Sequence, residues 1–108
     1  MATGRLNTPA QLAASTNTTV YTVPAGYYTV LNVSMTNTST SSVTIRLAIS
    51  TSGTPSIAEW IEYDTTILGK GVFERTGLVV DAGKTIVAWA SAGSAVNVTV
   101  YGIETSTT

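Results

Sequence analysis

Short segments in which apolar and polar residues alternate recur along this chain, and turn-forming residues separate them. The clearest segment is 29–37, where three apolar residues alternate with three polar ones: Leu31, Val33 and Met35 against Asn32, Ser34 and Thr36. A repeat of two residues is the pattern of a half-buried β-strand. No stretch of any length shows the 3.6-residue repeat of a helix, so we expect an all-β chain.

Two turn sequences in the two halves of the chain are alike. Val23-Pro24-Ala25-Gly26 precedes the alternating strand 29–37, and Val80-Asp81-Ala82-Gly83 precedes a second apolar strand at 84–91. Proline presets φ for a turn, and glycine supplies a permissive position. We interpret each as the turn of a β-hairpin, one in each half, although Ala-Gly after Asp or Pro is also a common way to turn a β-chain.

Besides a short strand at 20–23, before the first turn, further strands are expected at 43–50, 60–64, 72–76, 78–80 and 96–101. In the first of these, four apolar residues face the core, namely Val43, Ile45, Leu47 and Ile49. Gly77 interrupts the segment 72–80, which suggests a bulge. Seven to eight short strands with turn signals between them predict an antiparallel β-sandwich. We expect a jelly-roll-like arrangement of two sheets in preference to an immunoglobulin-type one.

The 108 residues are enough for one domain. Residues 1–18 lack a clear periodic element and are expected to form an extended N-terminal arm, which either orders on a neighbour or frays. Residues 19–104 would form the sandwich, and residues 105–108 a loose tail.

Charged residues make up only 10% of the chain, far below the usual level of about 25%. Threonine takes their place, with 21 residues. A surface so poor in charge is weakly protected against association, so either partners cover much of it or the domain tolerates it. A net charge of −1 with scattered basic residues argues against nucleic acid. No apolar run is long enough to span a membrane.

The residue types needed for most catalytic and metal sites are missing. The chain has no His and no Cys, which removes the usual general base, thiolate ligands and disulfides. Glu62 and Asp64 share a strand face, but neighbours on one strand form a solvated face more naturally than a catalytic pair. We therefore expect no enzyme, no cofactor and no metal.

Six residues are candidates for contacts with other molecules. Arg5, Leu6 and Leu12 belong to the expected arm, and Arg46 points away from the core side of its strand. Trp60 and Tyr63 lie close together near a loop, where a sugar-binding domain would place stacking aromatics. The alternative is that Trp60 and Trp89 are anchors of the core or of a subunit interface.

The order of short strand and turn sequences along the chain resembles that of a known group of proteins. These short sequences cover most of the chain: Leu12 to Ala14, Thr19 to Gly26, the strand ending at Asn37, Arg46 to Ile49, Trp60 to Asp64, Glu74 to Leu78, Val80 to Lys84 and Val98 to Glu104. They resemble the small β-sandwich virion proteins of tailed bacteriophages, of the marine and cyanobacterial type. Where that family often has Gly-Asp after the last turn, this chain has Gly83-Lys84, which alters surface charge.

This resemblance implies a non-enzymatic structural protein of the virion, made in the host cytoplasm. The first expectation is a capsid decoration, or cement, protein that forms a homotrimer, contacts the major capsid protein and stabilises the shell. A tail, baseplate or fibre component is the alternative within the virion. A carbohydrate-binding module that recognises the host surface is an alternative of a different class.

Overall fold

A computed structural model of the chain describes residues 3–107. This range contains nine strands and one 3-10 helix: β1 (Thr3–Arg5), β2 (Ala10–Gln11), β3 (Thr18–Thr22), β4 (Tyr27–Asn37), β5 (Val43–Ser50), η1 (Ile57–Glu59), β6 (Trp60–Ile67), β7 (Val72–Val80), β8 (Thr85–Ala90) and β9 (Val96–Ser106). The predicted all-β class is confirmed. The prediction of seven to eight strands was too low, because the N-terminal segment contributes β1 and β2.

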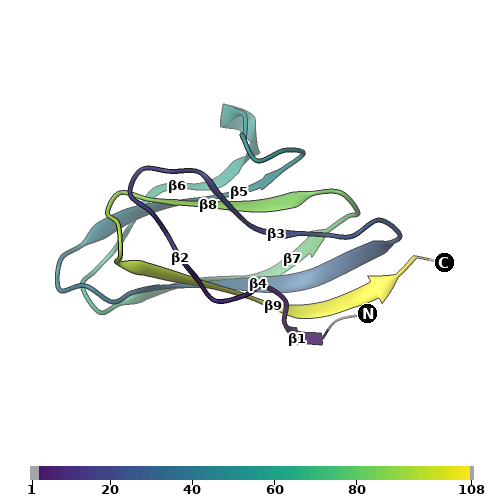
Figure 1. Cartoon of the computed structure of the whole chain (residues 1–108), viewed down its shortest axis with the longest axis horizontal. Helices are drawn as coiled ribbons and strands as arrows, with labels where there is room; N and C mark the ends of the chain where they lie inside the picture. The colour runs from purple at the N-terminus through teal and green to yellow at the C-terminus, as the bar shows by residue number, and fades with distance from the viewer. Residues whose placement is uncertain (1–2, 108) are drawn as a thin grey trace.

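The strands form two antiparallel sheets that pack as a sandwich (Figure 1). Sheet A has the order β1-β9-β4-β7, with β2 also on β9, and sheet B has the order β3-β8-β5-β6. Strands from the two ends of the chain thus pair inward: β1 and β2 with β9, β3 with β8, β4 with β7, and β5 with β6. This nested pairing across two sheets is the arrangement of a jelly roll, with its first strand broken in two.

The two similar turns are not hairpin turns, which corrects that interpretation. Each one carries the chain from one sheet to the other, β3 to β4 and β7 to β8. The turns lie side by side, because the Val23 N–H donates to the Lys84 carbonyl at 3.0 Å and the Gly83 N–H donates to the Val23 carbonyl at 2.9 Å. Gly26 and Gly83 hold φ of 82° and 81° at the third turn position, where a type II turn needs positive φ.

The N-terminal segment is extended, and its described residues lie against their own chain. The Asn7 side chain is buried, donates to the Val98 carbonyl at 3.1 Å and accepts from the Val100 N–H at 2.9 Å. Leu12 enters the main core with 1% exposure. Residues 6–9 separate β1 from β2, and Pro9 among them has no N–H for a ladder hydrogen bond.

The core lies between the sheets and is almost entirely aliphatic. Its largest fully buried side chains come from every layer of the fold: Leu12, Leu31, Met35, Ile45, Leu47 and Ile86. At the C-terminus, β9 extends to Ser106, and Thr107 donates through its N–H to the Gly26 carbonyl at 2.9 Å. Residues 105–107, expected in a loose tail, are therefore tied to the turn at Gly26, while residue 108 lies outside the described range.

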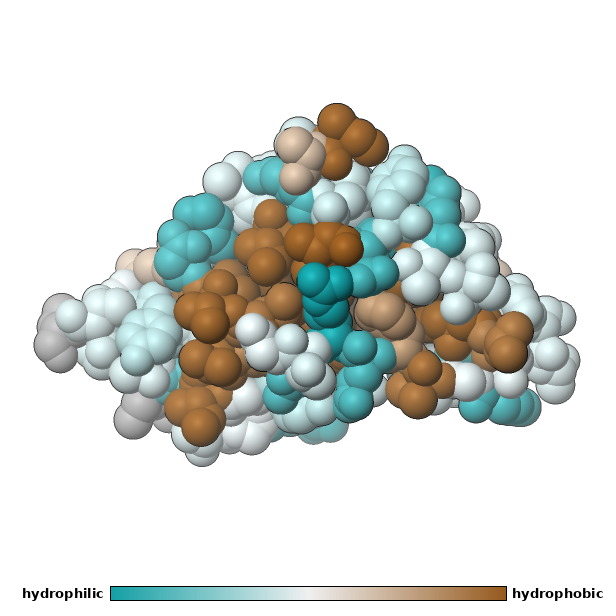
Figure 2. All heavy atoms as spheres, turned by 180° about the vertical axis from the view of Figure 1, so that it is seen from behind, coloured by the Kyte–Doolittle hydropathy of each residue, from teal (hydrophilic) through white to brown (hydrophobic). Residues whose placement is uncertain are grey.

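One edge strand of each sheet, β6 of sheet B and β7 of sheet A, lies on the side of the sandwich seen in Figure 2. There a hydrophilic strip separates two areas of apolar surface. Arg75 of β7 and Glu62 of β6 form an ion pair across the gap between the sheets. Register shifts in both edge strands, together with this pair, protect edges that would otherwise add a foreign strand.

Candidate interaction surfaces

The described part of the chain offers no arrangement typical of catalysis. Residues 3–107 hold no group of three or more metal-ligating side chains of the His, Cys, Asp or Glu type. Within the same range, no helix has the length and apolar character needed to cross a membrane. The candidate sites are therefore surfaces, one on the outer face of each sheet.

On the outer face of sheet B, one arginine is held between two aromatic rings. Arg46 of β5 lies directly opposite Trp89 of β8 in the sheet register. Its guanidinium carbon is 4.0 Å from the centre of the Trp89 ring and 4.1 Å from that of the Tyr63 ring. Trp60 meets Tyr63 edge to face, with ring centres 5.9 Å apart. We call Arg46, Trp60, Tyr63, Asp64 and Trp89 the arginine cluster.

Asp64 completes the arginine cluster with an ion pair. Its carboxylate accepts from Arg46 Nε at 2.7 Å, and this hydrogen bond raises the pKa of Arg46 above its usual value. Asp64 has a positive φ of 56° at a register shift between β5 and β6. The Arg46 guanidinium stacks on the Tyr63 and Trp89 rings and pairs with the Asp64 carboxylate. These contacts fix Arg46 within its own chain.

The segment 51–59 lies next to this cluster on the outer side of sheet B (Figure 1). Glu59 organises it by accepting from the Ser56 N–H at 2.9 Å and from the Ser50 hydroxyl at 2.8 Å, and these bonds lower the pKa of Glu59. Ala48 and Val87 are fully buried although they lie outside the main core. This part of the outer face is therefore covered by the chain itself.

The structure brings together three of the six residues predicted for contacts: Arg46, Trp60 and Tyr63. Arg5 and Leu6 lie on or just after β1 in the other sheet, and Leu12 is buried in the core, where it is not available to a partner. The sequence predicted Trp89 only as an anchor and did not connect it with Arg46. Alternation indicates that each of the two side chains points away from the core, but only the pairing of β5 with β8 shows that they are neighbours.

The outer face of sheet A is different, because large apolar side chains are exposed on it. Val30 of β4 pairs with Val79 of β7 on one side and with Ile103 of β9 on the other. These three residues form a row across the sheet, with exposures of 43%, 68% and 57%. We call them the apolar row. The apolar row was not predicted from the sequence, although the alternation in residues 29–37 puts the Val30 side chain on the face of the strand opposite to that of Leu31.

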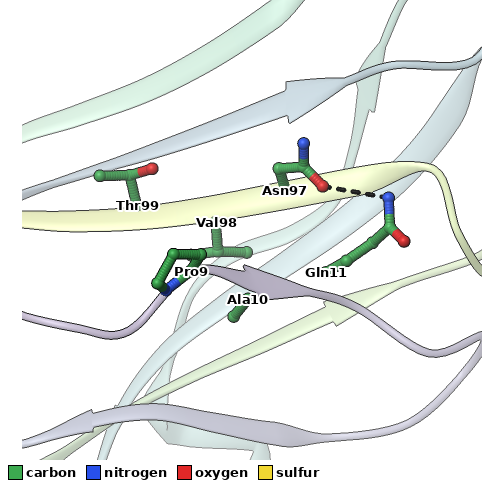
Figure 3. Close-up of a pocket in the computed structure, with 6 residues that line it drawn as sticks. All are labelled: Pro9, Ala10, Gln11, Asn97, Val98 and Thr99. Carbon is green, nitrogen blue, oxygen red and sulfur yellow. Dashed lines mark hydrogen bonds between the residues drawn. The ribbon is translucent and has the colours of Figure 1, made fainter.

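The one hollow described on the surface is a shallow depression between the N-terminal segment and β9 (Figure 3). Six residues line it: Pro9, Ala10, Gln11, Asn97, Val98 and Thr99. Gln11 Nε2 donates to Asn97 Oδ1 at 3.1 Å across its floor. None of the six is titratable or aromatic, and the amides satisfy each other, so nothing in the depression selects a ligand.

Two titratable side chains meet inside the sandwich. The Tyr21 hydroxyl of β3 donates to both oxygens of Glu104 of β9, at 2.8 and 2.6 Å, and Glu104 is buried. Burial raises the pKa of Tyr21 above its ordinary value of about 10, and the hydrogen bond to Glu104 adds to the effect. Deprotonation of Tyr21 would place two anions in contact.

We expect this contact to make the protein sensitive to alkali. A tyrosine whose folded-state pKa is raised contributes stability that is complete below about pH 10 and is lost as the pH rises toward that higher pKa. Between pH 10 and pH 12 the wild type should lose about 1 kcal/mol more than Tyr21→Phe, after allowance for solvent screening. Urea unfolding of both proteins across this range measures the difference, and equal losses would contradict the assignment.

Comparison of the chain with protein-family models, with curated proteins and with solved structures found no match in any of the three. The fold and the surfaces thus define a jelly-roll-like β-sandwich with the arginine cluster on a partly covered outer face of sheet B and an exposed apolar row on sheet A. The function is argued from these surfaces and from the residues.

Proposed function

We propose that the chain is a non-enzymatic structural protein of a bacteriophage virion, and specifically a capsid decoration protein that self-associates and stabilises the shell. The observation that carries the proposal is the exposed apolar row on a surface with very little charge. Exposed apolar side chains that gather across a sheet mark an interaction site. The order of turn and strand phrases in the sequence supports the assignment to a virion.

A decoration protein can act through many weak contacts. Each copy on a lattice makes several contacts, and once the first has formed the others form at high effective concentration. In this proposal the major capsid protein is the partner, and each copy contacts both the shell and other copies of the chain. The N-terminal segment has a smaller part than an arm would have, since Asn7 and Leu12 hold it on its own sandwich.

A carbohydrate-binding role receives less support from the arginine cluster. Sugar stacking needs a free aromatic face. The Arg46 guanidinium occupies one face of both Tyr63 and Trp89, and Asp64 holds it there. The cluster is therefore better suited to stiffening the outer face of sheet B than to binding a sugar.

Reconstitution on empty shells tests the proposal. Shells assembled without the chain are mixed with the purified protein, sedimented, and heated in a calorimeter. We expect saturable co-sedimentation and a higher melting temperature of the shell. Protein that stays in the supernatant at all concentrations would contradict a decoration role, and binding without any change in melting temperature would contradict the stabilising part of it.

A further inference from the structure

The outer face of sheet A is the large surface that the chain leaves uncovered. In Figure 1, sheet A forms the lower layer, and no loop passes beneath it, whereas η1 and its loop lie above sheet B. Beyond the apolar row, the register places mainly uncharged side chains on this face: Thr3, Tyr28, Asn32, Ser34, Thr36, Val72, Asn97, Thr99, Tyr101 and Thr105. The face is thus weakly polar, with the apolar row toward one end and exposed Val72 at the other.

Two charged side chains lie on this face, and they have opposite signs. Arg5 is on β1 opposite Tyr101, and Glu74 is on β7 opposite Ser34. Glu74 accepts a hydrogen bond from the Tyr101 hydroxyl at 2.8 Å. Neither residue is part of the ion pairs found among residues 3–107. The positive charge therefore lies at one margin of the sheet and the negative charge at the other, and neither has a counter-ion among residues 3–107.

We propose that this face binds a second copy of the same chain, face to face about a two-fold axis. The axis would run parallel to the strands, midway between β9 and β4. It would place Ile103 of each copy over Val30 of the other, and β1 of each copy over β7 of the other. Val30 and Ile103 then meet each other across the axis, Val79 lies over Thr3 of the other copy, and each margin meets the margin of opposite charge.

The positions of the two charges fit this arrangement. Arg5 shares a row with Tyr101 and Asn32, and Glu74 shares the next row with Ser34. Rows two residues apart along a strand are about 7 Å from each other. An arginine side chain spans this distance, so the arrangement forms two symmetric Arg5–Glu74 pairs between the copies. A face that carried a single sign of charge would repel itself in the same geometry.

The area of the face is also close to what a dimer needs. The strands of sheet A contain 3 residues in β1, 2 in β2, 11 in β4, 9 in β7 and 11 in β9. At about 3.4 Å per residue and about 4.8 Å between strands they cover about 590 Å², about three quarters of the roughly 800 Å² that each partner buries in a stable complex. Because an isologous contact of this kind is two-fold, the basic unit would be a dimer, in place of the trimer that the family resemblance implies.

Sedimentation equilibrium of the purified chain tests the dimer without reference to the virion, so its outcome is separate from that of the shell experiment. We expect a mass twice the 11.2 kDa of the chain. Val30→Lys buries a charge at the centre of the contact and should raise Kd by about tenfold or more. The matched control is Ile57→Lys in η1, where the native side chain is 76% exposed and away from sheet A, and it should leave Kd unchanged.

A charge exchange tests the orientation of the two copies. Arg5→Glu and Glu74→Lys should each weaken the dimer, and the double variant should recover most of the loss because the pairs form again with reversed signs. Thermal melting checks that each variant folds, and Val79→Lys replaces Val30→Lys if the latter does not. A wild type that is monomeric at about 100 μM, well above a micromolar Kd, would overturn the proposal. A trimer, or a Kd that the lysine substitution on sheet A leaves unchanged, would overturn it as well. If the dimer Kd of the double variant is no lower than that of the single variants, the proposed axis is overturned.

Discussion

Replacing Leu12 by alanine should lower the free energy of unfolding by about 3 kcal/mol. Truncation of a fully buried leucine costs about 2–5 kcal/mol, because transfer free energy is lost and a cavity remains. Leu12 has 1% exposure, packs in the main core, and donates its N–H to the Val96 carbonyl at 2.9 Å. Denaturant unfolding of the wild type and of the variant measures the change.

The result separates two interpretations of the N-terminal segment. A leucine in an arm that does not pack on the sandwich would change stability by less than about 0.5 kcal/mol. Leu68→Ala provides the control, since Leu68 is an exposed residue of similar size in a loop, and it should also stay within about 0.5 kcal/mol. If Leu12→Ala behaves like Leu68→Ala, the N-terminal segment is not part of the fold.

The second large effect is expected for Gly102→Ala, in the centre of sheet A. Gly102 of β9 lies opposite Leu31 of β4. A Cβ atom at this position would lie 2.1 Å from the Val30 carbonyl oxygen and 2.7 Å from the Leu31 Cα. Both atoms belong to the backbone of the neighbouring strand, so the two longest strands would have to separate. We expect a loss of about 3 kcal/mol or more.

Gly53→Ala is the matched control for this substitution. An added Cβ at Gly53 would meet the side-chain oxygen of Thr19 at 3.2 Å, and a side chain can rotate away. The free energy of unfolding should change by no more than about 0.5 kcal/mol. Amide hydrogen exchange along β4 and β9 locates the damage, since faster exchange there and not in sheet B identifies the clash. A Gly102→Ala protein as stable as Gly53→Ala would mean that β4 and β9 are not this close.

The sequence was sufficient for the fold class, because period-two alternation depends on each strand alone. Val43, Ile45 and Leu47 are buried as predicted, and the bulge expected near Gly77 coincides with a register shift between β4 and β7. Pairing between strands was not predictable in the same way. A turn such as Pro24 to Tyr27 has the same local chemistry whether the chain returns to its own sheet or crosses to the other.

The N-terminal segment shows a related limit. Its only strong signals are the single apolar residues Leu6 and Leu12, spaced too far apart for a strand pattern. Asn7, a residue common in loops, acts here as a strand residue by bonding through its side chain to Val98 and Val100. Such a contact, across more than 90 positions, depends on the folded topology.

The candidate surfaces were partly predictable. Trp60 and Tyr63 as a pair, and Arg46 by itself, were predicted to be available to a partner, but Arg46 stacks on Tyr63 and Trp89, and Trp60 meets Tyr63 edge to face. The apolar row combines one residue from each of three strands that are distant in the sequence: Val30 of β4, Val79 of β7 and Ile103 of β9. No single strand contains enough exposed apolar residues to reveal it.

Copy number in the virion tests the proposed function most directly. Under this proposal a bacteriophage encodes the chain, and quantitative mass spectrometry of its purified virions gives the ratio of the chain to the major capsid protein. A decoration protein should be present in a ratio near one to one. A ratio of a few per cent would contradict shell decoration and favour a tail position, and complete absence from the particles would contradict a virion role altogether.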